Sequence, residues 1–309
     1  MIKFAMVFPG QGSQTTGMLA DLAAKFPLIK AVFRQASSVL GYDLWQLVQQ
    51  GSAIELNKTW QTQPALLTSS VAIWRVWEQQ HGSLPLMMAG HSLGEYSALV
   101  CADVLNFEQA VRLVELRGKW MQQAVPPGIG GMEVIIGLNN NIITKICAES
   151  AQGQVVSLVN FNSPYQAVIA GNKEAIKRAV VACKIAGAKR VLPLPISVPA
   201  HCILMKPAAE KMAIALEQII FNPPRCPILN NVDVKIESSP EAIRSALVRQ
   251  IYNPVRWVES VEYMAMKGIK QLLEIGPGKV LTGLNKRIIN TLNVASINDV
   301  ASLYSALKQ

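Results

Sequence analysis

The chain has 309 residues, half of them hydrophobic and 16% charged, so it can bury a sizeable core in one large domain or two of ordinary size. Its formal net charge of +9 favours an acidic protein or a phosphate-bearing substrate as partner, and with no nucleic-acid-binding motif we expect no nucleic-acid partner. No apolar run reaches the roughly 18 residues of a membrane helix, and the 5 cysteines include no Cys-x-x-Cys pair, so we expect reduced thiols and a cytoplasmic protein that binds no membrane.

The first predicted strand, Phe4–Phe8, leads into a loop that contains Gly10-Gln11-Gly12. A dinucleotide-binding G-x-G-x-x-G loop would need a further glycine at the position of Thr15, so that interpretation fails. Loops at the carboxyl ends of parallel strands are nevertheless where α/β sheets gather their sites. Gln11 is therefore either a site residue or an exposed loop amide, and the local sequence does not separate the two.

Helical patterns follow over residues 18–35 and 63–79, and the second leads to a short apolar run at 86–89. Gln63 and Pro64 open the second pattern, which predicts Pro64 near the first helical position, where its missing N–H costs nothing. Strands that alternate with helices predict an α/β fold with a mostly parallel sheet.

The most informative stretch is Gly90-His91-Ser92-Leu93-Gly94, between the predicted strand at 86–89 and a predicted helix at 95–102. A G-x-S-x-G sequence at a strand-to-helix joint is the pattern of a nucleophile elbow, in which only glycine fits two residues to either side of the serine. The turn lifts the Ser92 hydroxyl and places the Leu93 N–H at the positive end of the helix, where an oxyanion is stabilised. The alternative, an accidental glycine-rich turn, loses weight because the flanking patterns fit, so we predict that Ser92 is a nucleophile.

The helix predicted after Asn106 carries an arginine on its apolar face. At ~100° per residue, Arg117 falls on one stripe with apolar side chains that include Met121, whereas Glu108 and Glu115 point to the opposite face. A buried guanidinium without a partner would cost several kcal/mol, so Arg117 needs an anion from elsewhere. That anion is either a distant Asp or Glu in a structural salt bridge or, as we favour, a substrate carboxylate held bidentately.

The middle of the chain has the order strand, helix, strand, strand, helix, strand, which is typical of a ferredoxin-like unit. Breaks at Pro126-Pro127-Gly128 and Gly130-Gly131 precede it. We therefore predict a large α/β domain over residues 1–126 and 198–309 with an inserted subdomain over 127–197. The predicted strands cover residues 132–137, 155–160, 166–170 and 190–194, the helices 142–149 and 173–186, and a turn 162–164.

Only 3 histidines are available as a base for a serine nucleophile. The position of His81 after a predicted helix and before Gly82 is typical of a solvated helix end. His91 lies within the elbow itself, too close to Ser92 in sequence to act easily as its base. His201, four residues after Ser197, lies where the chain re-enters the large domain and is the predicted base. No Asp or Glu stands out as a third member, so the residues predict a Ser–His dyad whose ring a backbone carbonyl or an amide could orient.

Taken together, these residues resemble the malonyl-CoA:acyl-carrier-protein transacylases of bacterial type II fatty acid synthesis over nearly the whole chain. The resemblance implies an α/β-hydrolase-like core with a ferredoxin-like insertion and an active site in the cleft between them. The motifs that carry it are Phe8-Pro9-Gly10-Gln11-Gly12-Ser13-Gln14, Gln63-Pro64-Ala65-Leu66, Gly90-His91-Ser92-Leu93-Gly94-Glu95, Arg117-Gly118, Asn160-Phe161-Asn162-Ser163-Pro164, Ser197 through His201, Asn253-Pro254-Val255-Arg256-Trp257 and Glu274-Ile275-Gly276-Pro277-Gly278.

The resemblance also implies roles for individual residues. Ser92 would carry the malonyl group as an ester, His201 would act as general base and acid, and Gln250 would orient His201 through its carbonyl. Gln11 and the Leu93 backbone would form the oxyanion hole. The substrate-binding residues would be those around the malonate carboxylate: Arg117, which binds it, with Gln63, Met121 and Asn162.

One residue departs from the family pattern. The first strand of the insertion carries Glu133 where relatives usually have a small residue, and a carboxylate facing the cleft would oppose malonate entry. Strand alternation alone does not tell which way Glu133 faces.

We therefore expect a ping-pong acyltransferase that moves malonyl from malonyl-CoA to the phosphopantetheine thiol of an acidic acyl carrier protein. The expected enzyme is a monomer and needs no metal or redox cofactor. Three alternatives stay open: an acyltransferase that serves a polyketide synthase in trans, a serine hydrolase of acidic thioesters, and an interaction module that uses the fold as a scaffold. Intact Ser92, His201 and Arg117 speak against the third.

Overall fold

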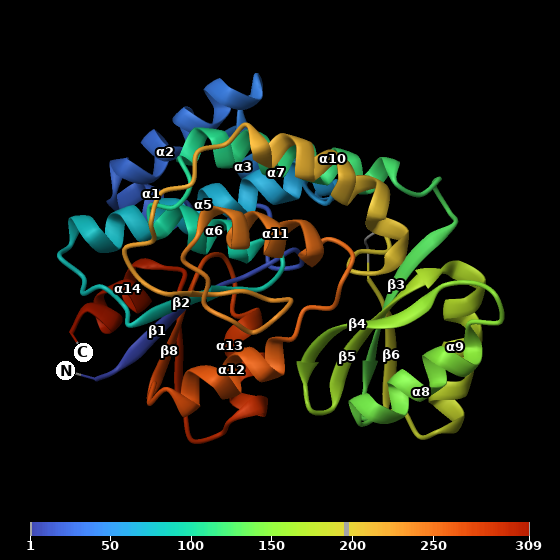
Figure 1. Cartoon of the computed structure of the whole chain (residues 1–309). Coiled ribbons are helices and arrows are strands. Elements are labelled where there is room, and N and C mark those ends of the chain that lie inside the picture. The colour runs from blue at the N-terminus through green and yellow to red at the C-terminus, as the bar shows by residue number, and fades with distance from the viewer. Residues whose placement is uncertain (1, 195–197, 309) are drawn as a thin grey trace.

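The computed structural model describes residues 2–194 and 198–308 (Figure 1). Within this part of the chain, five strands form a parallel sheet in the order β7-β2-β1-β8-β9. Ser197, and with it the predicted domain boundary at 197/198, lies outside the described residues. The strands are β1 (Phe4–Phe8), β2 (Met87–Gly90), β7 (Ile228–Leu229), β8 (Gln271–Ile275) and β9 (Asn293–Ile297).

Helices cover both faces of this sheet, because alternate residues of its buried strands point to opposite sides. On β1, Met6 and Phe8 join the larger core beneath α5 and α7, whereas Ala5 and Val7 pack towards α12 and α13 (Figure 1). The α/β class predicted from the sequence is confirmed. The helices around this sheet are α1 (Ala20–Lys25), α2 (Pro27–Leu40), α3 (Leu44–Gln50), α4 (Ala53–Leu56), α5 (Thr59–Gln79), α6 (Gly94–Cys101), α7 (Phe107–Gln123), α10 (Lys206–Glu217), α11 (Pro240–Gln250), α12 (Trp257–Met266), α13 (Val280–Ile288) and α14 (Val300–Leu307), with a 3₁₀ turn at Ile203–Met205.

A second sheet lies to one side of the first (Figure 1). Its strands are antiparallel in the order β4-β5-β3-β6, and α8 and α9 cover one face through a separate hydrophobic cluster. This is the strand order of a ferredoxin-like unit. The elements are β3 (Gly130–Ile136), α8 (Asn140–Ser150), β4 (Val156–Ser163), β5 (Gln166–Asn172), α9 (Lys173–Ile185) and β6 (Arg190–Pro193).

A short extended segment joins the two sheets. Val255 donates its N–H to the Val159 carbonyl at 2.8 Å, and its own carbonyl accepts from Phe161 at 3.0 Å. The segment that follows α11 therefore runs alongside β4 as a short parallel bridge. Trp257, at the start of α12, is fully buried and donates to Asn285 Oδ1 on α13, which fixes the segment to the large sheet's helices.

Some local predictions were wrong. The helix expected over 18–35 is two helices, because Phe26 precedes Pro27 and takes an extended conformation. Helix α5 begins at Thr59, so Pro64 lies inside it rather than at its first turn. The turn before Pro64 is held by packing, since Gly118 of α7 lies directly against the Trp60 backbone.

Two predictions within the small sheet shift as well. Asn162 and Ser163 continue β4, so the expected turn over 162–164 begins only at Pro164. Gly130 and Gly131 open β3 rather than forming a separate break before it.

Glu133 faces away from the large domain. It shares a face of β3 with Gly131, which lies against Ile176 of α9, and with Ile135, which belongs to the cluster beneath α8 and α9. Partial burial raises the pKa of the Glu133 carboxyl, and Lys184 of α9 partly offsets that rise. The objection that Glu133 would oppose a negatively charged substrate is therefore removed.

Candidate active site

The elbow has the geometry that its sequence predicts. Ser92 joins β2 to α6 with φ of 53°, in the left-handed region that non-glycine residues rarely adopt. A Cβ on Gly90 would lie 1.8 Å from the Gly94 carbonyl carbon, and one on Gly94 would lie 2.0 Å from the Phe8 carbonyl oxygen. Both glycines are thus required by the close approach of β1, β2 and α6, which leaves the Ser92 side chain partly exposed at the carboxyl end of the sheet.

His201 lies next to this serine. Its Nε2 is 2.7 Å from Ser92 Oγ, and its Nδ1 is 2.7 Å from the Gln250 backbone carbonyl. A carbonyl oxygen can only accept, so Nδ1 carries the proton of the neutral ring and Nε2 is left to accept from the Ser92 hydroxyl. The backbone carbonyl thus takes the orienting place that an Asp or Glu holds in a three-residue triad.

The ring is kept neutral by its surroundings. Burial, together with the positive charge of Arg117, lowers the pKa of His201 to about 3. The Gln250 carbonyl opposes this shift by accepting from Nδ1. An unprotonated Nε2 facing a hydroxyl is the arrangement that removes a proton from a serine.

Arg117 of α7 is buried, with 2% of its surface exposed, beside the same serine. Its Nη1 donates to Gln63 Oε1 at 2.9 Å, and its Nη2 donates to Gln250 Oε1 at 3.0 Å and to Ser92 Oγ at 3.4 Å. The guanidinium also lies over the Tyr96 ring, 5.3 Å from its centroid.

Arg117 forms no ion pair with any Asp or Glu in the described part of the chain. Glu115 pairs with Arg112 and Lys119 instead, and Glu108 accepts from Gln35. The structural salt bridge considered as an alternative is therefore wrong. The Arg117 Nε–H is buried and has no hydrogen-bond partner among the described residues, so the guanidinium keeps donor capacity for an added carboxylate.

The other predicted substrate-binding residues take different places. Gln63 lies between Arg117 and Met121, to whose sulfur its Nε2 donates at 3.7 Å. Asn162 of β4 instead contacts the elbow, where its Oδ1 is 2.8 Å from His91 Nε2. Through Asn162, the small sheet thus contacts the residue that directly precedes the serine. His91 also packs edge-on against Trp257 of α12.

Of the two predicted oxyanion-hole residues, Leu93 belongs to the elbow and Gln11 lies in the loop after β1. Leu93 immediately precedes α6, with its backbone at the positive end of the helix. The loop with Gln11 is held against the elbow, since a Cβ on Gly10 would lie 2.5 Å from the His91 carbonyl oxygen. Gln11 Nε2 is buried without a hydrogen-bond partner in the described residues. No hydrogen bond joins Gln11 to Ser92 in this part of the chain, so its role stays a prediction.

Sequence reasoning missed two residues behind the serine, Glu95 and Asn231. Asn231 is fully buried, accepts from the Ser92 N–H at 2.7 Å and donates to the Gly90 carbonyl at 2.6 Å. Glu95 accepts from the Asn231 N–H and from the Gln250 side chain. Glu95 lies in a recognised motif and was assigned no role, whereas Asn231 lies in a loop that shows no pattern of its own.

The described residues offer neither a metal site nor a membrane span. No cluster of three or more His, Cys, Asp or Glu side chains could hold a metal ion there. Nor does that part of the chain contain a helix with the length and hydropathy needed to cross a membrane.

Known proteins share both the sequence and the fold. A family model described as "Acyl transferase domain" matches residues 5–305. The malonyl CoA-acyl carrier protein transacylase of Salmonella typhimurium is 65% identical over 309 residues, covering 100% of both chains, and its Bacillus subtilis counterpart is 39% identical, covering 100% of this chain and 97% of its own.

Among solved structures, a malonyl-transacylase in complex with its type II PKS acyl-carrier protein is 68% identical, with a TM-score of 0.98 and 99% of each chain covered. An acyl carrier protein S-malonyltransferase from Vibrio cholerae is 62% identical, with a TM-score of 0.96 and coverage of 98% of this chain and 99% of that one. The resemblance drawn from the sequence motifs is thereby confirmed, and the chain belongs to the acyl transferase family, with the malonyl CoA-acyl carrier protein transacylases as its relatives.

Proposed function

We propose that this enzyme transfers the malonyl group of malonyl-CoA to the phosphopantetheine thiol of an acyl carrier protein through an ester on Ser92. The observation that carries the proposal is a buried arginine that forms no ion pair with a carboxylate of residues 2–194 and 198–308, 3.4 Å from a serine that is hydrogen-bonded to a neutral histidine. This combination fits an acyl group that is attached at one end and negatively charged at the other.

In the first half-reaction, Ser92 Oγ attacks the thioester carbonyl while His201 Nε2 takes the hydroxyl proton. The Leu93 N–H, with Gln11, stabilises the oxyanion of the tetrahedral intermediate. When the intermediate collapses, the carbon–sulfur bond breaks and His201 returns the proton to the CoA sulfur. The second half-reaction reverses these steps with the carrier thiol as nucleophile and Ser92 as leaving group.

The malonate carboxylate binds Arg117 in this mechanism, Gln63 and Met121 support the guanidinium, and Asn162 holds His91 of the elbow. Pairing with the carboxylate has a second effect. Because the charge of Arg117 lowers the pKa of His201, its neutralisation by the substrate raises that pKa and makes Nε2 a stronger base. A dicarboxylic acyl group thus activates its own transfer, and neither a metal nor a redox cofactor takes part.

The carrier protein docks, in this proposal, on a basic groove between the small sheet and α13. Lys189, Arg190 and Arg287 line this groove together with Tyr165 and Gln166. Lys286, next to Arg287 in the sequence, and Lys184 of α9 are exposed as well. An acidic carrier protein would be attracted to this face, in accord with the net charge of +9.

Two carrier classes fit the same chemistry. We favour the carrier of fatty acid synthesis, and the relative solved with a type II PKS carrier supports a polyketide carrier as the second candidate. We further propose that the enzyme acts as a cytoplasmic monomer. A serine hydrolase is disfavoured, because water would need no basic groove as its docking surface.

The test is the intact mass of the protein after mixing with malonyl-CoA, methylmalonyl-CoA and acetyl-CoA in turn. We expect a stable malonyl adduct that disappears when a holo carrier protein is added and reappears as malonyl-carrier. Rapid loss of the adduct to water, with no transfer to carrier protein, would support the hydrolase instead. Parallel assays with fatty acid and polyketide carriers distinguish the two carrier classes.

A further inference from the structure

Behind the catalytic residues lies a buried carboxylate that the mechanism above does not use. Glu95, in the first turn of α6, has 3% of its surface exposed and forms no ion pair in the described part of the chain. Its Oε2 accepts from Gln250 Nε2 at 2.8 Å and from the Asn231 N–H at 3.0 Å. A buried carboxylate is costly, so its position next to the nucleophile calls for an explanation.

We propose that Glu95 is a positioning residue that holds the Gln250 amide, and through it Arg117, in the orientation that binds the malonyl carboxylate. This inference rests on the proposed function of Arg117.

The Gln250 amide is held in one orientation by its neighbours. Its Nε2 faces two groups that can only accept, Glu95 Oε2 and the Ser92 carbonyl at 3.0 Å, so these neighbours fix which end is the NH₂. The amide oxygen must then face Arg117 Nη2, which can only donate, at 3.0 Å. Without Glu95 the amide would keep one of its two acceptors, and its NH₂ end would be free to turn towards the guanidinium.

Glu95 also supports the backbone of the elbow through Asn231. The Asn231 backbone N–H donates to Glu95, while the Asn231 side chain bridges the Ser92 N–H and the Gly90 carbonyl. Asn231 therefore holds the Ser92 backbone in its left-handed conformation, and Glu95 holds Asn231. The same carboxylate oxygen thus supports both the nucleophile and the carboxylate-binding arginine.

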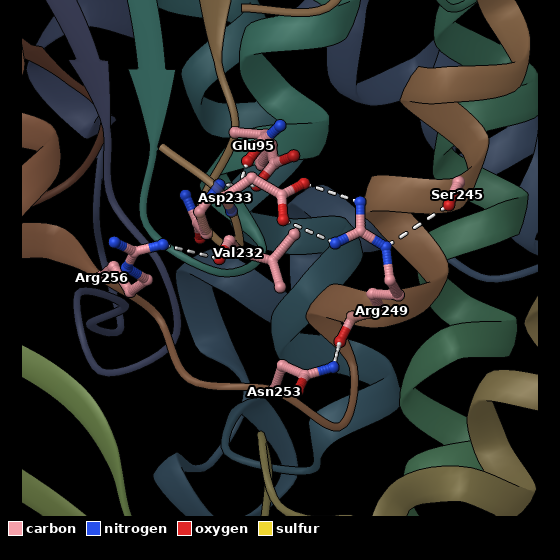
Figure 2. Close-up of polar contacts among 9 residues, drawn as sticks. Glu95, Val232, Asp233, Ser245, Arg249, Asn253 and Arg256 are labelled. Atoms are coloured by element: carbon pink, nitrogen blue, oxygen red, sulfur yellow. Dashed lines mark hydrogen bonds and ion pairs between the residues drawn. The ribbon is translucent and has the colours of Figure 1, made fainter. Parts of the chain in front are cut away.

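An ion pair holds in place the segments that carry the two donors, Gln250 and Asn231. Arg249 of α11 donates to both oxygens of Asp233 at 2.6 Å, and Figure 2 shows this forked pair. Arg249 directly precedes Gln250 and Asp233 follows Asn231 by two residues, so this pair ties together the segments that carry both donors. Arg256 adds a bond from its backbone N–H to the Asn231 carbonyl.

The charged and titratable neighbours of Glu95 are Arg117, Asp233 and Tyr96. Burial, opposed by the Gln250 and Asn231 donors and by Arg117 and reinforced slightly by Asp233, raises the pKa of the Glu95 carboxyl to about 7. The role proposed here needs an acceptor oxygen facing the two donors, which a glutamine at this position would also supply.

The experiment compares Glu95→Met and Glu95→Gln by kcat/KM for malonyl-CoA and acetyl-CoA. Methionine keeps the length of the side chain but accepts no comparable hydrogen bond. We expect Glu95→Met to lower malonyl transfer by about tenfold more than acetyl transfer, the size expected when a hydrogen bond to a charged group is lost. Glu95→Gln should keep the malonyl preference within about threefold of wild type, because its amide oxygen can accept from both donors.

The matched control is Glu274→Met. Glu274 is a fully buried glutamate that likewise accepts from neutral donors, the Leu281 and Thr282 N–H groups, but it lies on β8 away from the serine. Glu274→Met should lower Tm and leave the malonyl-to-acetyl ratio unchanged. If Glu95→Met gave the same pattern, Glu95 would be structural only, and if Glu95→Gln lost the preference as fully as Glu95→Met, the hydrogen-bond assignment would be overturned.

Should Glu95→Met fail to fold, Gln250→Leu tests the same link, because it removes the amide and keeps the backbone carbonyl that holds His201. It should lower the malonyl preference as Glu95→Met would, and an unchanged preference would overturn the inference. Failure of the proposed function itself has a separate signature: the wild-type protein would then show no malonyl transfer in the first place.

Discussion

Arg117 Nη2 and Ser92 Oγ lie 3.4 Å apart, so the cation that would bind a carboxylate is next to the atom that would carry the acyl carbonyl. A single methylene separates the two carboxyl carbons of malonate. The spacing therefore fits a short dicarboxylic acyl group, because a longer diacid would carry its second carboxylate past the guanidinium.

Removal of the nucleophile or the base should affect acylation directly. Ser92→Ala should abolish the malonyl adduct, and His201→Ala should slow acylation by the ~10²–10⁴ that is typical of losing a general base. Intact mass and rapid-quench kinetics measure the two effects. Cys202 is buried and the pKa of its thiol is raised to about 11, so it should not replace the serine. An adduct that persists in Ser92→Ala would contradict the assignment.

Arg117 should discriminate between acyl groups. Arg117→Ala should cost malonyl transfer ~3–5 kcal/mol, the range for breaking a buried charge pair. Acetyl transfer should hold steady or rise, since acetyl leaves the guanidinium unpaired in the wild type. Arg117→Lys should recover little, because an ammonium cannot reproduce a two-pronged contact. The measurement is kcat/KM for both thioesters in all three proteins, and a parallel fall for both would make Arg117 a structural residue.

The acid limb of the pH profile should also depend on Arg117. Acylation needs neutral His201, whose pKa burial and Arg117 lower to about 3, so the wild-type rate for acetyl-CoA should hold well below pH 6.5. Arg117→Ala removes a neighbouring positive charge, which raises the His201 pKa and moves the acid limb to higher pH. A Glu95→Gln background keeps the ionisation of Glu95 out of the profile. An acid limb that stays in place would show that Arg117 has no electrostatic effect on His201.

Docking of the carrier protein should be sensitive to salt and to charge reversal in the basic groove. Lys189→Glu and Arg287→Glu should weaken transfer to carrier protein, and added salt should do the same by screening the attraction. Transfer to free pantetheine should change much less. Lys30→Glu, on α2 outside the groove, is the matched control. Equal salt dependence for both acceptors would remove the docking argument.

The elbow glycines offer a test of stability with a built-in control. Gly94→Ala should destabilise the protein by more than about 3 kcal/mol or prevent folding. Its Cβ would lie 2.0 Å from the Phe8 carbonyl oxygen, and the backbones of β1 and α6 would both have to move to relieve the clash. A Cβ on Gly283 of α13 would have no atom of the described residues within 4 Å. Gly283→Ala should therefore stabilise the protein by about 0.5–1 kcal/mol. Chemical denaturation measures both, and similar effects for the two would contradict the steric account.

The sequence was most informative where function and local geometry share a few consecutive residues. The elbow could be predicted because Gly90, Ser92 and Gly94 satisfy one steric requirement within five positions. The burial of Arg117 could be predicted because the helical period places this residue on the apolar face of its helix. In both cases the physical signal is short in range, so no knowledge of the tertiary fold was needed.

Other features depend on packing that no local pattern encodes. Alternation could not tell which way Glu133 faces, because only the helices packed against Gly131 and Ile135 determine that this face of β3 is turned from the large sheet. Asn231 supports the elbow from 139 positions further along the chain, and nothing around it marks that contact. The early start of α5 before Pro64 likewise depends on α7, which comes later in the sequence.

The bridge between Val255 and β4 has a consequence for exchanging parts between relatives. Residues 251–257 leave α11 directly after Gln250, and Val255 among them is hydrogen-bonded to β4, so the segment that pairs with the small sheet is continuous with the carbonyl that orients His201. A chimera that takes only residues 127–197 from another enzyme would pair a foreign strand with a native partner at this point. The Gln250 carbonyl, and with it the orientation of His201, should therefore be kept only when residues 251–257 are exchanged together with the small sheet.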